Sequence, residues 1–108
     1  MVLGAAGQPW TEAEIETAME AYFSMLSWQL EGKPFNKSDV RLGVGERLPT
    51  RTKGSIEMQW SHISAVLDER SLAWLEGYRP LGNYQATLAD AVDGWLRRYP
   101  DVADAIGA

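Results

Sequence analysis

The side chains with the clearest potential for binding chemistry lie in residues 51–67, RTKGSIEMQWSHISAVL. The polar face of the predicted helix carries Glu57, Gln59, Ser61, His62 and Ser64, and the predicted base-contacting residues are Ser55, Gln59 and His62. Hydroxyl, amide and imidazole groups can hydrogen-bond to the edges of nucleobases. The same pattern also suits a core helix whose exposed face is merely neutral. The apolar residues that would form its buried face are Ile56, Trp60, Ile63 and Leu67.

A short basic stretch precedes and begins this predicted helix, although the whole chain carries a net charge of −5. The net charge argues against nonspecific binding to polyanions. A local run of cations in an acidic chain instead predicts one edge that could contact phosphates, although for any single cation solvation is the preferred reading. The predicted phosphate-binding residues are Lys37, Arg41, Arg47, Arg51 and Lys53.

Further candidate base-contacting residues follow in residues 70–84, where Gly77, Pro80 and Gly82 predict an ordered connection without helix. They are Tyr78, Arg79, Asn83 and Tyr84. Aromatic rings can stack on unpaired bases. Tyr78 is the preferred stacking residue because it lies in the loop, whereas Trp60, Trp74 and Tyr84 are predicted to belong to the core rather than to a ligand site.

The sequence offers little for catalysis or metal binding. It has no cysteine, and its single histidine, His62, has no carboxylate at helical ligand spacing. It contains neither a nucleophile-elbow motif nor a phosphate-binding glycine loop. We therefore predict a binding module that is not an enzyme and needs no cofactor or metal. An enzyme with His62 as acid or base is the third-ranked reading.

Hydrophobic periodicity and capping residues predict an all-α fold of four helices. The first helix would run to Glu31 from a capping box formed by Thr11 and Glu14. The second would be capped by Asn36 or Ser38 and extend to Leu48. The third would begin after Thr52 and reach about residue 69, and the fourth would span about residues 84–99 before Pro100. The second and third helices have the order of a helix-turn-helix unit.

The predicted organisation is one compact helical domain over residues 10–100, with a flexible N-terminus at 1–9 and a C-terminal tail at 101–108 that frays or forms a short turn. We find no signal peptide and no run long enough to span a membrane. With no cysteine present, these features favour the cytoplasm, or the nucleoid if the protein binds DNA.

Residues 10–14 (WTEAE), residues 51–56 (RTKGSI) and Trp60 resemble the Myb/SANT type of helix-turn-helix, whose third helix enters the major groove. The middle tryptophan of that family has no counterpart here.

A second resemblance covers residues 10–98. The runs Asn36-Lys37, 54–57 (GSIE), 63–67 (ISAVL) and 77–85 (GYRPLGNYQ) are similar to a small helical domain of bacteria. That domain occurs beside HNH nuclease and other restriction-associated domains, and alone in an actinomycete protein that binds 5-methylcytosine DNA. The family usually has asparagine at the position of His62 and a more basic central helix. The resemblance implies binding to double-stranded DNA. A narrower implication is binding to methylated DNA in a restriction or epigenetic role.

An alternative function is a helical module for protein–protein interaction or oligomerisation. Phe23 and Trp28 fall off the main apolar stripe of the first predicted helix, and surplus apolar residues often mark an interface. A homodimer would be compatible with both functions, since it would double a modest DNA contact and match a symmetric site.

Overall fold

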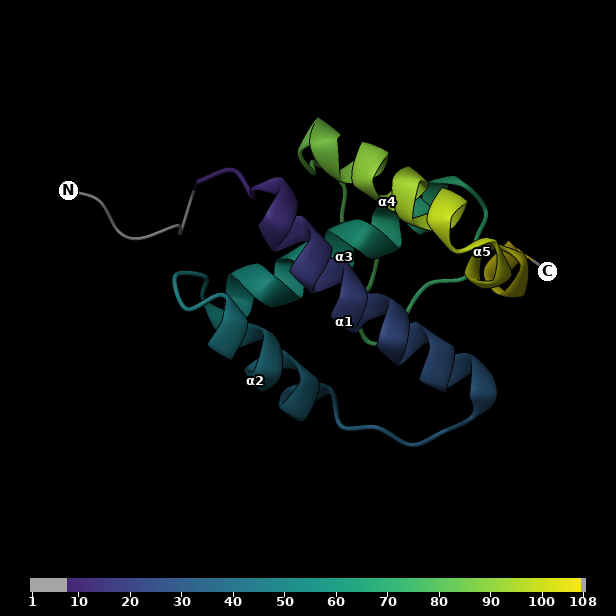
Figure 1. Ribbon diagram of the computed structural model, residues 1–108, viewed down its shortest axis with the longest axis horizontal. Helices are drawn as coiled ribbons and strands as arrows, with labels where there is room; N and C mark the ends of the chain where they lie inside the picture. The colour runs from purple at the N-terminus through teal and green to yellow at the C-terminus, as the bar shows by residue number, and fades with distance from the viewer. Residues whose placement is uncertain (1–7, 108) are drawn as a thin grey trace.

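The computed structural model describes residues 8–107 of the chain, and these residues form five helices and no strand. The helices are α1 (Glu12–Glu31), α2 (Lys37–Arg47), α3 (Lys53–Glu69), α4 (Ala86–Arg98) and α5 (Pro100–Gly107) (Figure 1). The predicted all-α fold is confirmed. Residues 1–7 of the predicted flexible N-terminus, and residue 108 of the tail, lie outside the described range.

The first three helices begin at the capping residues that the sequence offers. Thr11 and Glu14 form the capping box of α1: the Glu14 N–H donates to Thr11 Oγ1 at 3.2 Å, and the Thr11 N–H donates to Glu14 Oε1 at 3.0 Å. Asn36 caps α2, and Thr52 caps α3. α1 ends at Gly32, whose φ of 71° is a left-handed conformation that glycine adopts at little cost. These ends agree with the sequence prediction.

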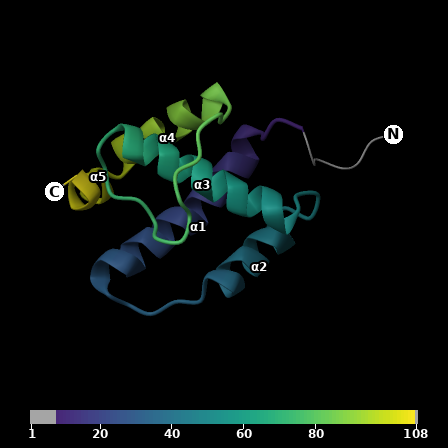
Figure 2. The ribbon, with the colours of Figure 1, turned by 180° about the vertical axis from the view of Figure 1, so that it is seen from behind.

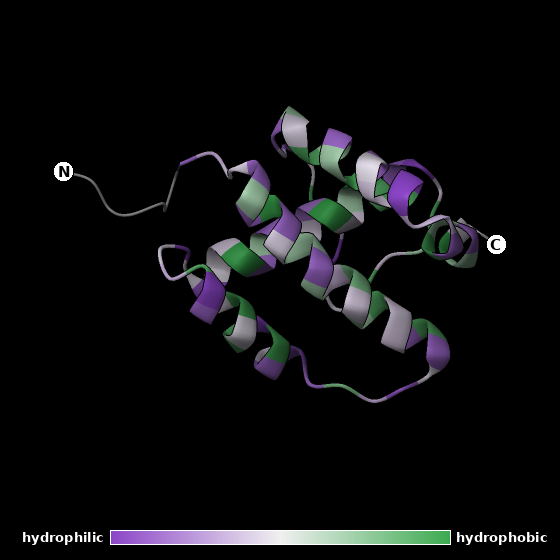
Figure 3. Ribbon diagram, in the orientation of Figure 1, coloured by the Kyte–Doolittle hydropathy of each residue, from purple (hydrophilic) through white to green (hydrophobic). Residues whose placement is uncertain are grey.

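α1 and α3 form the centre of the molecule. α1 packs against α2, α3 and α4, and α3 also packs against α2 and α4, so α2 and α4 lie on opposite sides of the central pair (Figure 1). Seen from behind, the connection between α3 and α4 passes across α3 (Figure 2). Apolar residues alternate with hydrophilic ones along the helices, as expected for helices with one buried face (Figure 3).

The core is held by two aromatic side chains that also satisfy buried polar groups. Trp60 is fully buried, and its Nε1 donates to the Ala18 carbonyl at 3.1 Å. The Tyr22 hydroxyl accepts a hydrogen bond from the Leu75 N–H at 2.9 Å and lies 2.8 Å from Ser64 Oγ. Burial raises the pKa of Tyr22 to about 12. One phenol therefore joins α1, α3 and the following connection.

The C-terminal segment differs from the prediction. Pro100 begins a fifth helix, in the first position where a missing N–H costs least. Ile106 is buried, and its carbonyl accepts a hydrogen bond from the Ala73 N–H at 2.9 Å. The expectation of a frayed tail or short turn at residues 101–107 was therefore wrong, because these residues pack on the connection that follows α3. α4 also begins two residues later than predicted, at Ala86.

Candidate ligand-binding groove

Arg51 holds the segment before α1 against the body of the protein. Its Nη1 donates to the Gln8 carbonyl and its Nη2 to the Pro9 carbonyl, each at 2.9 Å. The same guanidinium donates to Glu14 Oε2 at 3.0 Å and to Oε1 at 2.8 Å, and it lies 4.7 Å from the centroid of the Trp10 ring. We call residues 8–10 the strap. Residues 8 and 9, predicted as part of a flexible terminus, are thus fixed by a buried cation.

The other side of the strap is fixed by Gln85, which precedes α4. The Trp10 N–H donates to Gln85 Oε1 at 2.8 Å, and Gln85 Nε2 donates to the Trp10 carbonyl at 3.0 Å. One side-chain amide thereby pairs with both backbone polar groups of Trp10, much as a neighbouring strand would.

Between the strap, the first half of α3 and residues 83–85 lies a groove of about 540 Å³, which we call the strap groove. This volume is within the roughly 300–1,000 Å³ typical of small-molecule sites. The groove brings together six predicted site residues, namely Arg51, Ser55, Gln59, His62, Asn83 and Tyr84. Its remaining lining residues, which the site prediction did not include, are Gln8, Pro9, Trp10, Met58 and Gln85.

Two lining side chains hold buried polar atoms without a partner. Ser55 Oγ and Gln59 Nε2 are inaccessible to solvent and make no hydrogen bond with any described residue. Only 4% of the Gln59 surface is exposed. Leaving such a group unsatisfied costs on the order of 1–3 kcal/mol. These residues are one helical turn apart on α3 and line the same groove, so both unsatisfied atoms lie beneath its surface and would need a change of rotamer to reach a ligand.

His62 lines the groove in a defined tautomer. Its Nδ1 lies 2.7 Å from the Leu81 carbonyl oxygen, which can only accept, so Nδ1 carries the proton. In the neutral ring, Nε2 is therefore a hydrogen-bond acceptor. No hydrogen bond from a described residue reaches Nε2. His62 thus supplies an acceptor at the groove, and the Gln59 amide lies beneath the groove surface.

Two aromatic rings border the groove, one from the strap and one from the connection before α4. The Arg51 guanidinium lies over the Trp10 ring, as described above. Tyr84 donates its hydroxyl proton to Glu69, and this contact raises the pKa of Tyr84. The Tyr84 ring centroid lies 6.3 Å from that of His62. Trp10 was missed as a site residue, although its place just before the helix cap is typical of a side chain that packs at a helix entrance.

The predicted phosphate-binding cations do not gather at this groove. Arg51 is only 6% exposed and all the interactions given above are internal, so its assignment to phosphate binding was wrong. Lys37 Nζ donates to the Glu76 carbonyl at 2.5 Å, and Arg47 pairs with Glu20 at 3.2 Å. Arg41 lies 4.0 Å from Glu57. Lys53 is exposed and makes no ion pair with a described residue.

The loop candidates divide between core and surface. Tyr78 is 8% exposed and packs edge-to-face on Trp60 with 5.1 Å between ring centroids, so the preferred stacking residue is already part of the core. Burial raises the pKa of Tyr78. Arg79 and Asn83 are exposed. Asn83 adopts a left-handed conformation with φ of 59°, which turns the chain at the edge of the groove.

Over residues 8–107, no helix is long and apolar enough to cross a membrane. The same residues hold no cluster of three or more histidine, cysteine or acidic side chains suited to a metal ion. Comparisons with protein-family models, curated proteins and solved structures find no match to this chain.

Proposed function

We propose that this protein is a DNA-binding module without catalytic activity of its own, and that the strap groove receives a base that has left the double helix. The observation that carries this proposal is a groove of suitable size lined by six predicted site residues, with the unsatisfied polar atoms of Ser55 and Gln59 directly beneath its surface. A flipped base is held by hydrogen bonds to its Watson–Crick edge and by stacking on side chains. Both kinds of contact are available here.

The charge of the groove favours an uncharged ligand. Its only charged lining residue is Arg51, and Glu14 compensates that cation through two short hydrogen bonds. The remaining polar lining groups are amides, hydroxyls and an imidazole. A phosphate would find little net positive charge in this groove, whereas a planar heterocycle with donors and acceptors would find complementary partners.

The donor and acceptor set fits cytosine. Once its side chain turns toward the groove, Gln59 Nε2 would donate to the ring nitrogen or carbonyl oxygen of the base, and His62 Nε2 would accept from the exocyclic amino group. Met58, about half exposed, supplies an apolar contact for a 5-methyl group at the same groove. The similarity of residues 77–85 to the methylcytosine-associated bacterial domain supports the narrower proposal of a 5-methylcytosine reader in restriction or epigenetic function.

Phosphate contacts would come from few side chains. Lys53 and Arg79 are exposed and make no ion pair with a described residue. Two such contacts predict a weak salt dependence, with log K falling against log salt with a slope of about −2. Five cations acting together would give a slope of about −4.5. Salt dependence therefore separates groove binding from docking on a broad basic surface.

The test uses fluorescence anisotropy with duplexes that differ only in one 5-methylcytosine, measured at two salt concentrations. Gln59→Met and Ser55→Ala remove the two groove donors, and Ser38→Ala on the exposed face of α2 is the matched control. We expect tighter binding to the methylated duplex, a loss of at least fivefold for the groove variants and no change for the control. A 2-aminopurine beside the target base should brighten on binding, because flipping disrupts its stacking.

If both duplexes bind equally well, the protein binds DNA but does not recognise 5-methylcytosine. Unchanged affinity of Gln59→Met together with a silent 2-aminopurine would exclude the groove as a base site. No binding at low salt would overturn DNA binding and favour the alternative, a helical interaction module. That alternative draws support from the large apolar side chains of Leu30, Leu42 and Tyr99, each between 45% and 54% exposed.

A further inference from the structure

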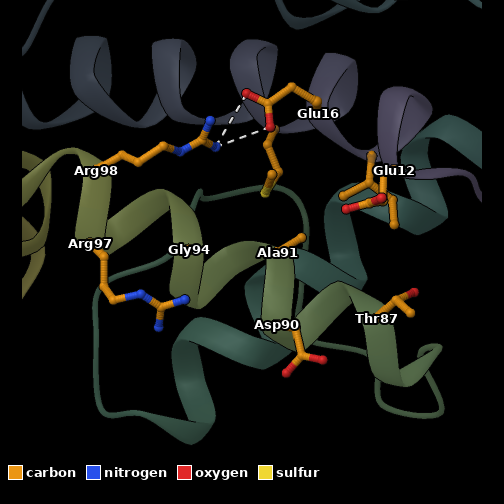
Figure 4. A pocket seen from close by; sticks show the side chains of 10 residues that line it. Glu12, Glu16, Thr87, Asp90, Ala91, Gly94, Arg97 and Arg98 are labelled. Atoms are coloured by element: carbon orange, nitrogen blue, oxygen red, sulfur yellow. Dashed lines mark hydrogen bonds and ion pairs between the residues drawn. The ribbon is translucent and has the colours of Figure 1, made fainter.

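A second groove, of about 720 Å³, runs between α1 and α4 (Figure 4). It shares no lining residue with the strap groove. α4 contributes residues at helical spacing, including Asp90, Gly94 and Arg97, so the groove exposes one continuous face of that helix. α1 contributes Glu12 and Glu16. The groove therefore lies on a surface that is independent of the proposed base site.

The charges of this groove are ordered along α4. Glu12 and Asp90 lie toward the end where α4 begins, and Arg97 and Arg98 lie toward the end where it finishes (Figure 4). Arg98 Nη2 already donates to both Glu16 oxygens, at 3.0 and 3.3 Å. Glu12, Asp90 and Arg97 make no ion pair with any described residue. Acidic and basic groups at opposite ends of one helix face are thus left for an outside partner.

The middle of the groove allows close approach. A Cβ placed on Gly94 would meet only Arg97 Nη2, at the ordinary contact distance of 3.7 Å. Ala91, three residues before Gly94, also lines the groove with a small side chain. Between the charged ends, the small side chains of α4 would let another helix approach closely once the Arg97 guanidinium turns from Gly94 toward an acidic partner.

We propose that α4 pairs with α4 of a second copy of this chain, antiparallel and across this groove. A two-fold axis places residue i opposite j and j opposite i. Putting Asp90 opposite Arg97 of the second copy sets the axis midway between residues 93 and 94, beside Gly94. The two ion pairs that result lie two turns, about 10.5 Å, apart along the helix.

A second copy is the partner that fits because the charge order reverses when the helix is turned around. A parallel pair would place Asp90 against Asp90 and Arg97 against Arg97, which is repulsive. A uniformly acidic or basic partner would satisfy only one end. Since the groove is small and its charges are solvated, we expect a weak dimer with a dissociation constant in the micromolar range or above, roughly as for small transient interfaces.

The test is sedimentation analysis from low micromolar to about millimolar protein at low salt. Asp90→Arg and Arg97→Asp each place like charges opposite one another, and each should weaken dimerisation at least tenfold. An equimolar mixture of these two variants should form a heterodimer, because one carries two cations and the other two anions at the paired positions. The double variant D90R/R97D should dimerise like the original chain.

Asp104→Arg on α5 is the control, since this exposed residue lines neither groove. All three substituted positions are exposed, and circular dichroism checks that each variant remains helical. A chain that stays monomeric up to millimolar concentration overturns the proposal. Single variants that dimerise as well as the original, or a mixture that stays monomeric, would also overturn it. None of these outcomes depends on DNA binding.

Discussion

The ion pair between Arg51 and Glu14 makes stability depend on one carboxylate, and Glu14→Gln tests this. The Arg51 side chain is 2% exposed and that of Glu14 is 16% exposed. The hydrogen bond from Arg51 is the main cause that lowers the pKa of Glu14 from 4.5 to about 2. Glutamine preserves the size of the side chain and suits a capping box, so the substitution mainly removes the charge.

The lowered pKa sets the expected magnitude. One unit of pKa corresponds to about 1.4 kcal/mol, so the difference between 4.5 and about 2 corresponds to roughly 3 kcal/mol. Because the carboxylate keeps some contact with water, screening reduces the expected loss at pH 7 to about 2 kcal/mol. The pKa is lower in the folded chain, so this stabilisation is fully present above about pH 4.5 and is lost as the pH falls toward 2.

Urea unfolding followed by tryptophan fluorescence measures the free energy of unfolding at pH 7 and at steps down to pH 2.5. Glu12→Gln is the matched control, because Glu12 is also in the first turn of α1 but makes no ion pair with a described residue. We expect Glu14→Gln to lose about 2 kcal/mol and the control to lose about 0.5 kcal/mol. The original chain should also lose more stability on acidification than Glu14→Gln. Equal losses for both variants, or parallel pH profiles, would refute the assigned role of the pair.

Three other substitutions have defined outcomes. Tyr22→Phe leaves the Leu75 N–H and Ser64 Oγ without their buried partner, so urea unfolding should show a loss of about 1–3 kcal/mol, and no loss would contradict the role given to the phenol. Gly43→Ala places a methyl group where nothing lies within 4 Å, and thermal unfolding should show a gain of about 0.5–1 kcal/mol. Gln59→Met removes an unsatisfied amide, so it should raise stability by about 1 kcal/mol while weakening DNA binding; a less stable variant would mean that the amide is satisfied in solution.

Local signals in the sequence predicted the helices well because each helix end depends on neighbouring residues. Thr11, Asn36 and Thr52 cap the helices that follow them, and Gly32 ends α1. The C-terminal helix was missed because Pro100 was taken as the end of helical structure. Its stability depends on packing Ile106 near the connection after α3, and this contact is remote in sequence.

The site was predicted only in part, for a related reason. Ser55, Gln59 and His62 do share one face of α3 and line one groove. Spacing alone does not reveal that the strap and residues 83–85 enclose this face, since those segments are distant in sequence. The sequence also does not show whether an arginine is solvated or buried. Arg51 is buried, and two of its acceptors are backbone carbonyls of the strap. The burial of Tyr78 against Trp60 is equally a property of the tertiary structure.

The pairing of Gln85 with Trp10 has a kinetic consequence. It joins positions 75 residues apart, so its two hydrogen bonds can form only after the helices have brought the strap and Gln85 together. The strap should therefore dock late in folding, after α1 and α3 have assembled. Contacts of this kind control the unfolding rate more than the folding rate, and they open first in native conditions. Under the proposed base binding, release of the strap would open one wall of the strap groove while the helices remain folded.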